Sequence, residues 1–86
     1  MMEQSQQDIA KRLTQFYIEE MGLQAEDFDN QTLLFSDGHL DSMDLIRIVA
    51  FIESEFQMKV PTFEVSLESF DTVEKISQFI HQKKTQ

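Results

Sequence analysis

Apolar residues recur at intervals of three and four positions in three stretches of this chain, a spacing that places them on one face of an α-helix. The pattern predicts helices from residue 5 or 7 to residue 21, from 42 to 56, and from about 73 to 82. Gly22 suits the end of the first helix, and Pro61 disfavours helix in the residue before it. No alternation typical of a β-strand persists, so the sequence predicts an all-α fold.

The segments between these helices are also expected to be ordered. No period lasts between Gly22 and Asp41, but five apolar residues are spaced through this stretch: Leu23, Phe28, Leu33, Leu34 and Phe35. They predict a long ordered loop pinned to the core, and loops of this length usually carry function. A short third helix is expected near residues 64–68. The sequence Asp71-Thr72-Val73-Glu74 has the form of a capping box, which we expect to start the last helix.

The size and composition indicate one small domain. The chain has 86 residues, of which 41% are hydrophobic and eight are Phe, so we expect a single domain over 1–86 with polar ends at about 1–4 and 83–86. The absence of cysteine excludes a disulfide framework, a thiolate zinc site and a cysteine nucleophile. No apolar run is long enough for stable membrane insertion, and we expect a cytoplasmic monomer.

Negative charge is concentrated in the middle of the chain. The formal net charge is −9, and the segment 19–74 alone has fourteen acidic residues against two basic ones, Arg47 and Lys59, for a net of −12. Such a surface repels nucleic acid and favours partners with basic patches. Charge alone is equally compatible with an acidic surface that only keeps the protein in solution.

One serine stands at the predicted start of the second helix, within the sequence Asp37-Gly38-His39-Leu40-Asp41-Ser42-Met43-Asp44. Asp41 supplies the side-chain oxygen preferred at a helix N-cap, which leaves the Ser42 hydroxyl free for chemistry. A phosphate attached to Ser42 would lie beside unpaired backbone N–H groups at the positive end of the helix dipole, which favours an anion by about 0.3–1 kcal/mol. The sequence therefore predicts an attachment site for a phosphate-linked group.

This serine motif and its flanks resemble the prosthetic-group site of acyl carrier proteins and of their aminoacyl and peptidyl relatives. The matching parts are Leu33-Leu34-Phe35, Gly38, Leu40-Asp41-Ser42-Met43, Val60-Pro61, Glu64 and Phe70-Asp71-Thr72-Val73-Glu74-Lys75-Ile76. The resemblance covers nearly the whole chain and implies a four-helix bundle. It also implies a 4'-phosphopantetheine arm on Ser42, supported by Asp41, whose thiol holds a cargo as a thioester. The expected partners are a phosphopantetheinyl transferase, a cargo-activating ligase or acyltransferase, and a downstream acceptor or synthase enzyme.

The second helix is expected to present a surface to these partners. At 100° per residue, its core face contains Leu45, Ile48, Val49, Ile52 and Phe56. A mostly apolar strip on the opposite side begins beside Ser42, and we call it the docking strip: Met43, Ile46, Arg47 and Ala50, flanked by Asp44 and Glu53. The resemblance favours docking here, because carrier proteins present this helix to partner enzymes.

Other chemistries fit the sequence less well. His39 and Ser42 with Asp37 or Asp41 contain the residue types of a hydrolytic triad, but six consecutive positions cannot easily aim them at one another. The acidic residues lack the ligand spacing of a calcium loop, so we expect neither a catalytic residue nor a dedicated metal site. The alternative to a carrier is an unmodified acidic helical adaptor that binds partners through the same strip.

The sequence leaves the cargo open. The segments around Val60-Pro61 and Phe70-Asp71-Thr72 resemble free-standing D-alanyl and other aminoacyl carriers, whereas Asp41-Ser42-Met43-Asp44 is more similar to fatty-acid-type carriers. Arg47 departs from the familiar fatty-acid carriers, which tend to place an acid on that part of the helix. We therefore expect a specialised pathway, with Arg47 acting in partner selection.

Overall fold

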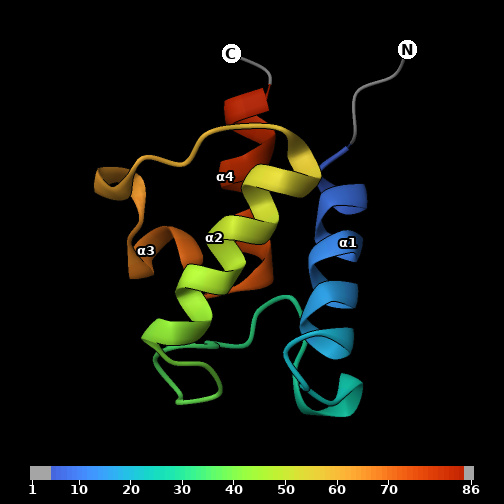
Figure 1. Cartoon of the computed structure of the whole chain (residues 1–86). Helices are drawn as coiled ribbons and strands as arrows, with labels where there is room; N and C mark the ends of the chain where they lie inside the picture. Colours follow the sequence, from blue (N-terminus) through green and yellow to red (C-terminus); the bar gives the residue numbers. More distant parts are fainter. Residues whose placement is uncertain (1–4, 85–86) are drawn as a thin grey trace.

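The computed structural model describes residues 5–84 and consists of helices joined by turns and loops (Figure 1). The helices are α1 (Gln6–Glu19), α2 (Ser42–Phe56), α3 (Leu67–Phe70) and α4 (Val73–Lys84), with 3₁₀ turns at Ala25–Asp27 and Thr62–Glu64. No strand occurs within residues 5–84, so the all-α prediction is confirmed. The first four and last two residues of the predicted polar ends lie outside the described part of the chain.

The first two helices begin where the sequence predicts, and each has a local reason to do so. The hydroxyl of Ser5 accepts a hydrogen bond from the Asp8 N–H at 3.1 Å and caps α1. This helix ends at Glu19, two residues before the predicted end, and Gly22 takes the left-handed conformation at φ +81°. The second helix has the predicted bounds, and Gln57 just beyond it is left-handed at φ 53°.

The short third helix lies later than predicted. The segment Thr62–Glu64 forms a 3₁₀ turn, and α3 runs over Leu67–Phe70 instead of residues 64–68. The hydroxyl of Ser66 accepts a hydrogen bond from the Ser69 N–H at 3.3 Å, so Ser66 is the N-cap and fixes the later start.

The predicted capping box at residues 71–74 is wrong. Helix α4 begins at Val73, and the Thr72 hydroxyl caps it by accepting from the Lys75 N–H at 3.0 Å. Asp71 does not cap this helix because its carboxylate binds the long loop. At the other end α4 extends to Lys84, two residues beyond the predicted end, and the Lys84 ammonium donates to the Phe56 carbonyl at 3.0 Å.

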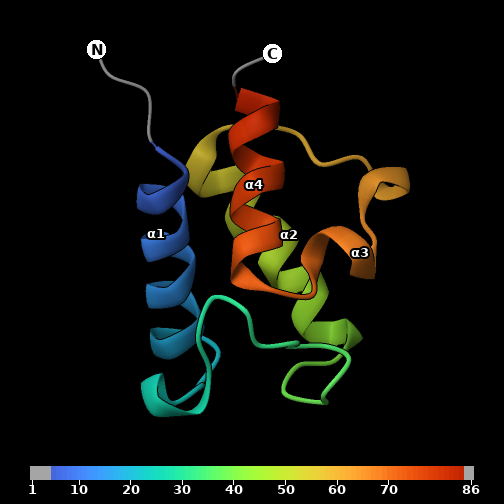
Figure 2. The same cartoon turned by 180° about the vertical axis from the view of Figure 1, so that it is seen from behind.

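Helices α1 and α4 pack closely side by side. In Figure 1 α2 crosses in front of α4 and ends beside the start of α1, and in Figure 2, seen from behind, α4 lies in front of α2. The buried core draws on all four helices and on the connecting segments: Ile9, Ala10, Leu13, Tyr17, Leu34, Leu40, Ile48, Ile52, Phe56, Val60, Phe70, Val73, Ile76 and Ile80. Burying a large apolar side chain stabilises the fold by about 1.5–3 kcal/mol. Leu34 therefore holds the long loop to the core as predicted, and Leu40 adds a second anchor. Leu23, Phe28 and Phe35 pack half-buried against the core, whereas Leu33, which was predicted to do the same, is 40% exposed.

Tyr17 carries a polar group into this core. Its side chain is fully buried, and its hydroxyl has no hydrogen-bond partner among residues 5–84. Burial raises the pKa of Tyr17, because the phenolate would lose its hydration. No helix in the described part of the chain is long and apolar enough to span a bilayer.

Candidate functional site

Ser42 is the first residue of α2, and the preceding Asp41 caps the helix. The Asp44 N–H donates to the Asp41 carboxylate at 3.1 Å, and the Asp41 N–H donates back to the Asp44 carboxylate at 3.0 Å. This reciprocal pair is a capping box, a motif that was predicted from the sequence only before α4. It fixes the backbone around Ser42 without using the Ser42 hydroxyl.

The Ser42 side chain is exposed, and its hydroxyl makes no hydrogen bond to any group within residues 5–84. The N–H groups of Ser42 and Met43 belong to the first turn and therefore have no acceptor within the helix. A phosphate on the hydroxyl would lie next to these N–H groups and the positive end of the α2 dipole. The residues present therefore fit a phosphate-linked group.

The loop that leads to Ser42 is tied to the turn before α4 by Asp71. The Asp71 carboxylate accepts from the Phe35 N–H at 2.8 Å, from the Ser36 N–H at 3.0 Å and from the Ser36 hydroxyl. The Asp71 backbone carbonyl accepts from the Leu34 N–H at 2.7 Å. One residue thus binds three consecutive loop residues.

The environment of Asp71 favours its ionised form. Burial opposes the charge, but the hydrogen bonds from Ser36 and Phe35, together with the positive charge of Lys75, outweigh it and lower the pKa of Asp71 below its ordinary value. Sequence reasoning missed this role, because the partners lie 35 and 36 positions away.

A tight turn then carries the chain from the bound loop to the helix. The Gly38 N–H donates to the Phe35 carbonyl at 3.1 Å, and Gly38 adopts φ +84°, a conformation that glycine takes without strain. The Leu40 N–H donates back to the Leu34 carbonyl at 2.9 Å. Since Leu34 is itself bound to Asp71, the start of α2 is connected to the α3–α4 turn through a short chain of hydrogen bonds.

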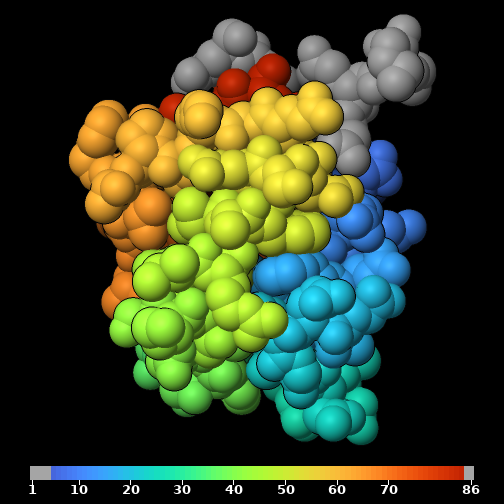
Figure 3. Space-filling view, in the orientation of Figure 1, coloured from blue at the N-terminus to red at the C-terminus, as the bar shows by residue number. Residues whose placement is uncertain are grey.

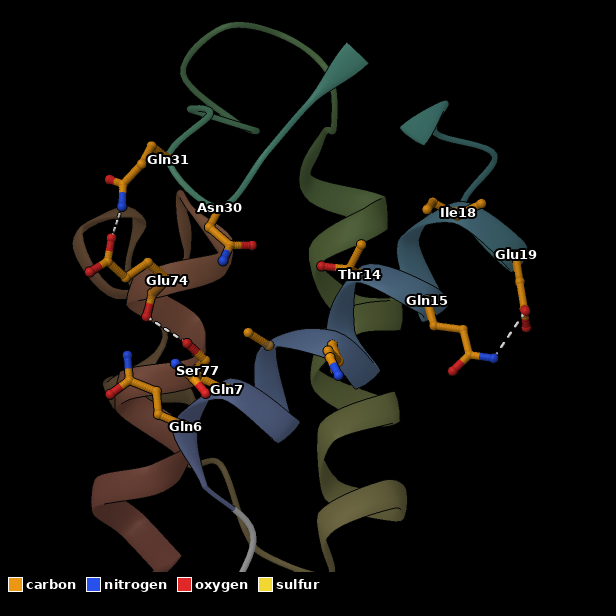
Figure 4. A pocket seen from close by; sticks show the side chains of 12 residues that line it. Gln6, Gln7, Thr14, Gln15, Ile18, Glu19, Asn30, Gln31, Glu74 and Ser77 are labelled. Carbon is orange, nitrogen blue, oxygen red and sulfur yellow. Dashed lines mark hydrogen bonds between the residues drawn. The ribbon is translucent and has the colours of Figure 1, made fainter. Parts of the chain in front are cut away.

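The earlier part of the loop is held to α4. The Glu74 N–H donates to the Asn30 carbonyl at 3.1 Å, and the Gln31 amide donates to the Glu74 carboxylate (Figure 4). Asp29 accepts from the Gln31 N–H and the Thr32 hydroxyl, and these hydrogen bonds lower the pKa of Asp29. The loop is therefore fixed at two points before it reaches Ser42.

The docking strip is exposed, but three of its polar members also bind within the chain. Met43 and Ile46 are 69% and 64% exposed, and Arg47 and Ala50 are exposed as well. Glu53 is half-buried and accepts from the Val60 N–H at 2.9 Å, whereas Asp44 completes the capping box. The Arg47 guanidinium donates to the backbone carbonyl of Glu20 at 3.0 Å. The structure thus gives Glu53, Asp44 and Arg47 partners inside the molecule that the sequence did not reveal.

The residues weighed for other chemistries do not gather into a site. Asp37 and His39 are exposed on the loop, and neither side chain bonds to Ser42. Within residues 5–84, no group of three or more His, Asp or Glu side chains could hold a metal ion.

A separate hollow lies on another side of the molecule. A groove of about 980 Å³ runs between α1, α4 and the loop around Asn30, on the side of these helices away from α2 (Figure 4). Ten of its twelve lining residues are polar, and neither Ser42 nor any docking-strip residue contributes to it. The groove is therefore separate from the serine site.

Comparisons with known proteins agree with this geometry. A family model described as a phosphopantetheine attachment site matches residues 11–80, which include α2 and the whole long loop. The chain is also similar to an acyl carrier protein of Buchnera aphidicola subsp. Baizongia pistaciae (strain Bp), with 27% identity over 74 residues, covering 86% of this chain and 92% of that protein. The cofactor of such a domain is 4'-phosphopantetheine. Because the family model spans most of the chain, this protein belongs to the acyl carrier protein family, whose domain carries the phosphopantetheine attachment site.

Proposed function

We propose that Ser42 is the residue to which 4'-phosphopantetheine is attached, and that the chain carries an acyl or aminoacyl group between biosynthetic enzymes. The observation that carries this proposal is the exposed, unbonded Ser42 hydroxyl at the first position of α2. Attachment needs a hydroxyl that an enzyme can reach, held in a fixed backbone, and the Asp41–Asp44 capping box supplies that fixed backbone. Asp41 thus supports the site by positioning Ser42.

The arm would supply a thiol that holds the cargo as a thioester. The chain itself is assigned no catalytic step, since its role is to present the arm. The proposed partners are a phosphopantetheinyl transferase, a cargo-activating ligase or acyltransferase, and a downstream acceptor or synthase enzyme. They are proposed to meet the docking strip, where two large apolar side chains, Met43 and Ile46, are exposed next to Ser42.

The cargo is proposed to belong to a specialised pathway, because Arg47 sets this helix apart from the familiar fatty-acid carriers. The enzymes encoded beside this protein would identify the cargo. We also propose that the protein is a monomer and that it works in the cytoplasm.

Intact mass tests the attachment directly. The protein is incubated with coenzyme A and a phosphopantetheinyl transferase of broad range, and its mass is measured before and after. We expect the mass of one phosphopantetheine to be gained by the wild type and by Ser54→Ala, a control at an exposed serine of α2, and we expect peptide mapping to place it on Ser42. Ser42→Ala should gain nothing. A full gain in Ser42→Ala, or none in the wild type, would refute the proposal and favour the unmodified adaptor.

A further inference from the structure

The outer faces of α1 and α2 are joined by side-chain contacts that recur once per turn. At one end, Arg12 forms an ion pair with Glu55 at 2.8 Å. One turn along each helix, the rings of Phe16 and Phe51 stack with centroids 4.0 Å apart and planes 14° apart. The two helices run antiparallel (Figure 1). A contact one turn further along α1 therefore lies opposite a residue four positions earlier on α2.

The third contact continues this register and reaches the docking strip. Four residues beyond Phe16 lies Glu20, and four residues before Phe51 lies Arg47, whose guanidinium donates to the Glu20 carbonyl at 3.0 Å. We call these three contacts the α1–α2 seam. On the face shown in Figure 3, the atoms of α2 meet those of α1 without a hollow between them.

The last contact compensates for a missing charge at the end of α1. Glu20 is the C-cap of α1, so its carbonyl belongs to the orphan acceptors at the negative end of the helix dipole. The last turn of α1 contains no basic residue, whereas Glu19 and Glu20 both add negative charge there. Arg47 supplies the cation from the neighbouring helix, and it is one of only two basic residues in the segment 19–74.

We propose that Arg47 is a positioning residue that clamps the last turn of α1 against α2, so that the surface meeting partner enzymes includes Glu19 and Glu20 as well as the docking strip. This inference rests on the proposed function and extends its interaction surface to a second helix. The occupant is an enzyme surface with basic side chains, because both glutamates are exposed and the segment they begin has a net charge of −12, from fourteen acidic and two basic residues.

Amide hydrogen exchange tests the clamp without any partner. The reporters are the N–H groups of Glu20 and Leu23, which bond to the Phe16 carbonyl at 2.8 Å and the Tyr17 carbonyl at 3.1 Å. Arg47→Gln should speed their exchange about tenfold relative to the wild type, as expected for the loss of one charge-assisted hydrogen bond.

The matched control is Lys59→Gln, which removes the other basic residue of the acidic segment. The Lys59 side chain makes no hydrogen bond or ion pair to groups within residues 5–84, so this change should leave both reporters unchanged. Equal exchange in the two variants would overturn the clamp.

Kinetics of phosphopantetheinylation test the surface. The double variant Glu19→Gln/Glu20→Gln should raise the KM of the transferase about two- to fivefold with little change in kcat, because surface charges act mainly on encounter. The control, Glu26→Gln/Asp27→Asn, removes the same number of exposed acids from the 3₁₀ turn after α1 and should change KM less.

The possible failures are distinguishable. Modification with equal KM in the two double variants would overturn the two-helix surface and leave the attachment at Ser42 intact. If neither the wild type nor any variant is modified, both the attachment at Ser42 and the docking surface are refuted. The hydrogen-exchange result would still decide whether Arg47 clamps α1 to α2.

Discussion

Replacing Asp71 by alanine should destabilise the protein strongly, although this residue is neither apolar nor catalytic. The change removes the acceptor for the Phe35 N–H, the Ser36 N–H and the Ser36 hydroxyl in a buried setting. A hydrogen bond to a charged group contributes about 1.5–3 kcal/mol, and loop donors recover part of this by binding water. We therefore expect a loss of about 2–4 kcal/mol in total.

The assay is thermal unfolding followed by circular dichroism at neutral pH. For a domain of this size, 1 kcal/mol shifts Tm by about 4–8 °C, so a loss of 3 kcal/mol lowers Tm by about 12–24 °C. The control is Asp37→Ala, which removes an exposed acid from the same loop, and its Tm should stay within about 3 °C of the wild type, as for a surface change of about 0.5 kcal/mol or less.

The pH dependence provides a second test of the same reasoning. The pKa of Asp71 is lowered in the folded protein, so its ionised form adds stability above the unfolded pKa of about 3.9, and this stability is lost as the pH falls through the folded pKa. The Tm difference between the wild type and Asp71→Asn should be constant from about pH 5 to pH 7 and shrink below about pH 4. A difference that does not change with pH, or an Asp71→Ala variant as stable as Asp37→Ala, would refute the role assigned to Asp71.

Three further predictions concern the helix cap, the buried tyrosine and the surface charge. Asp41→Ala should lower the free energy of unfolding by about 1 kcal/mol and slow phosphopantetheinylation, because it removes one half of the capping box at Ser42. A normal rate of modification and an unchanged Tm would show that the cap is dispensable. Tyr17→Phe should raise Tm by about 4–8 °C, because it removes a buried hydroxyl without a partner among residues 5–84 at a gain of about 1 kcal/mol. A fall in Tm, measured by calorimetry, would refute this by showing that the hydroxyl stabilises the fold. Tm should also rise between about 0.1 and 1 M NaCl, as the screening length falls from about 10 to 3 Å, and a Tm insensitive to salt would mean that the central negative charges are already paired.

Helix periodicity and capping residues were enough to predict the three long helices and the candidate serine. The spacing of apolar residues placed α2 at its observed bounds, and Asp41 was recognised as its N-cap, because helix periodicity and capping depend on residues three or four positions apart. The Ser42 hydroxyl could be predicted to be free because the residue that caps the helix, Asp41, is its direct neighbour in the sequence.

The contacts that hold the candidate site in place depend on how the helices pack. Asp71 looked like a helix cap in the sequence, but the loop donors 35 and 36 positions away take its carboxylate, and Thr72 caps α4 instead. Arg47 was expected to act in partner selection on the docking strip, yet it also binds a carbonyl 27 positions away. A polar side chain can satisfy its hydrogen bonds locally or with a distant backbone group, and the packing of the helices decides between them by bringing the distant group within about 3 Å.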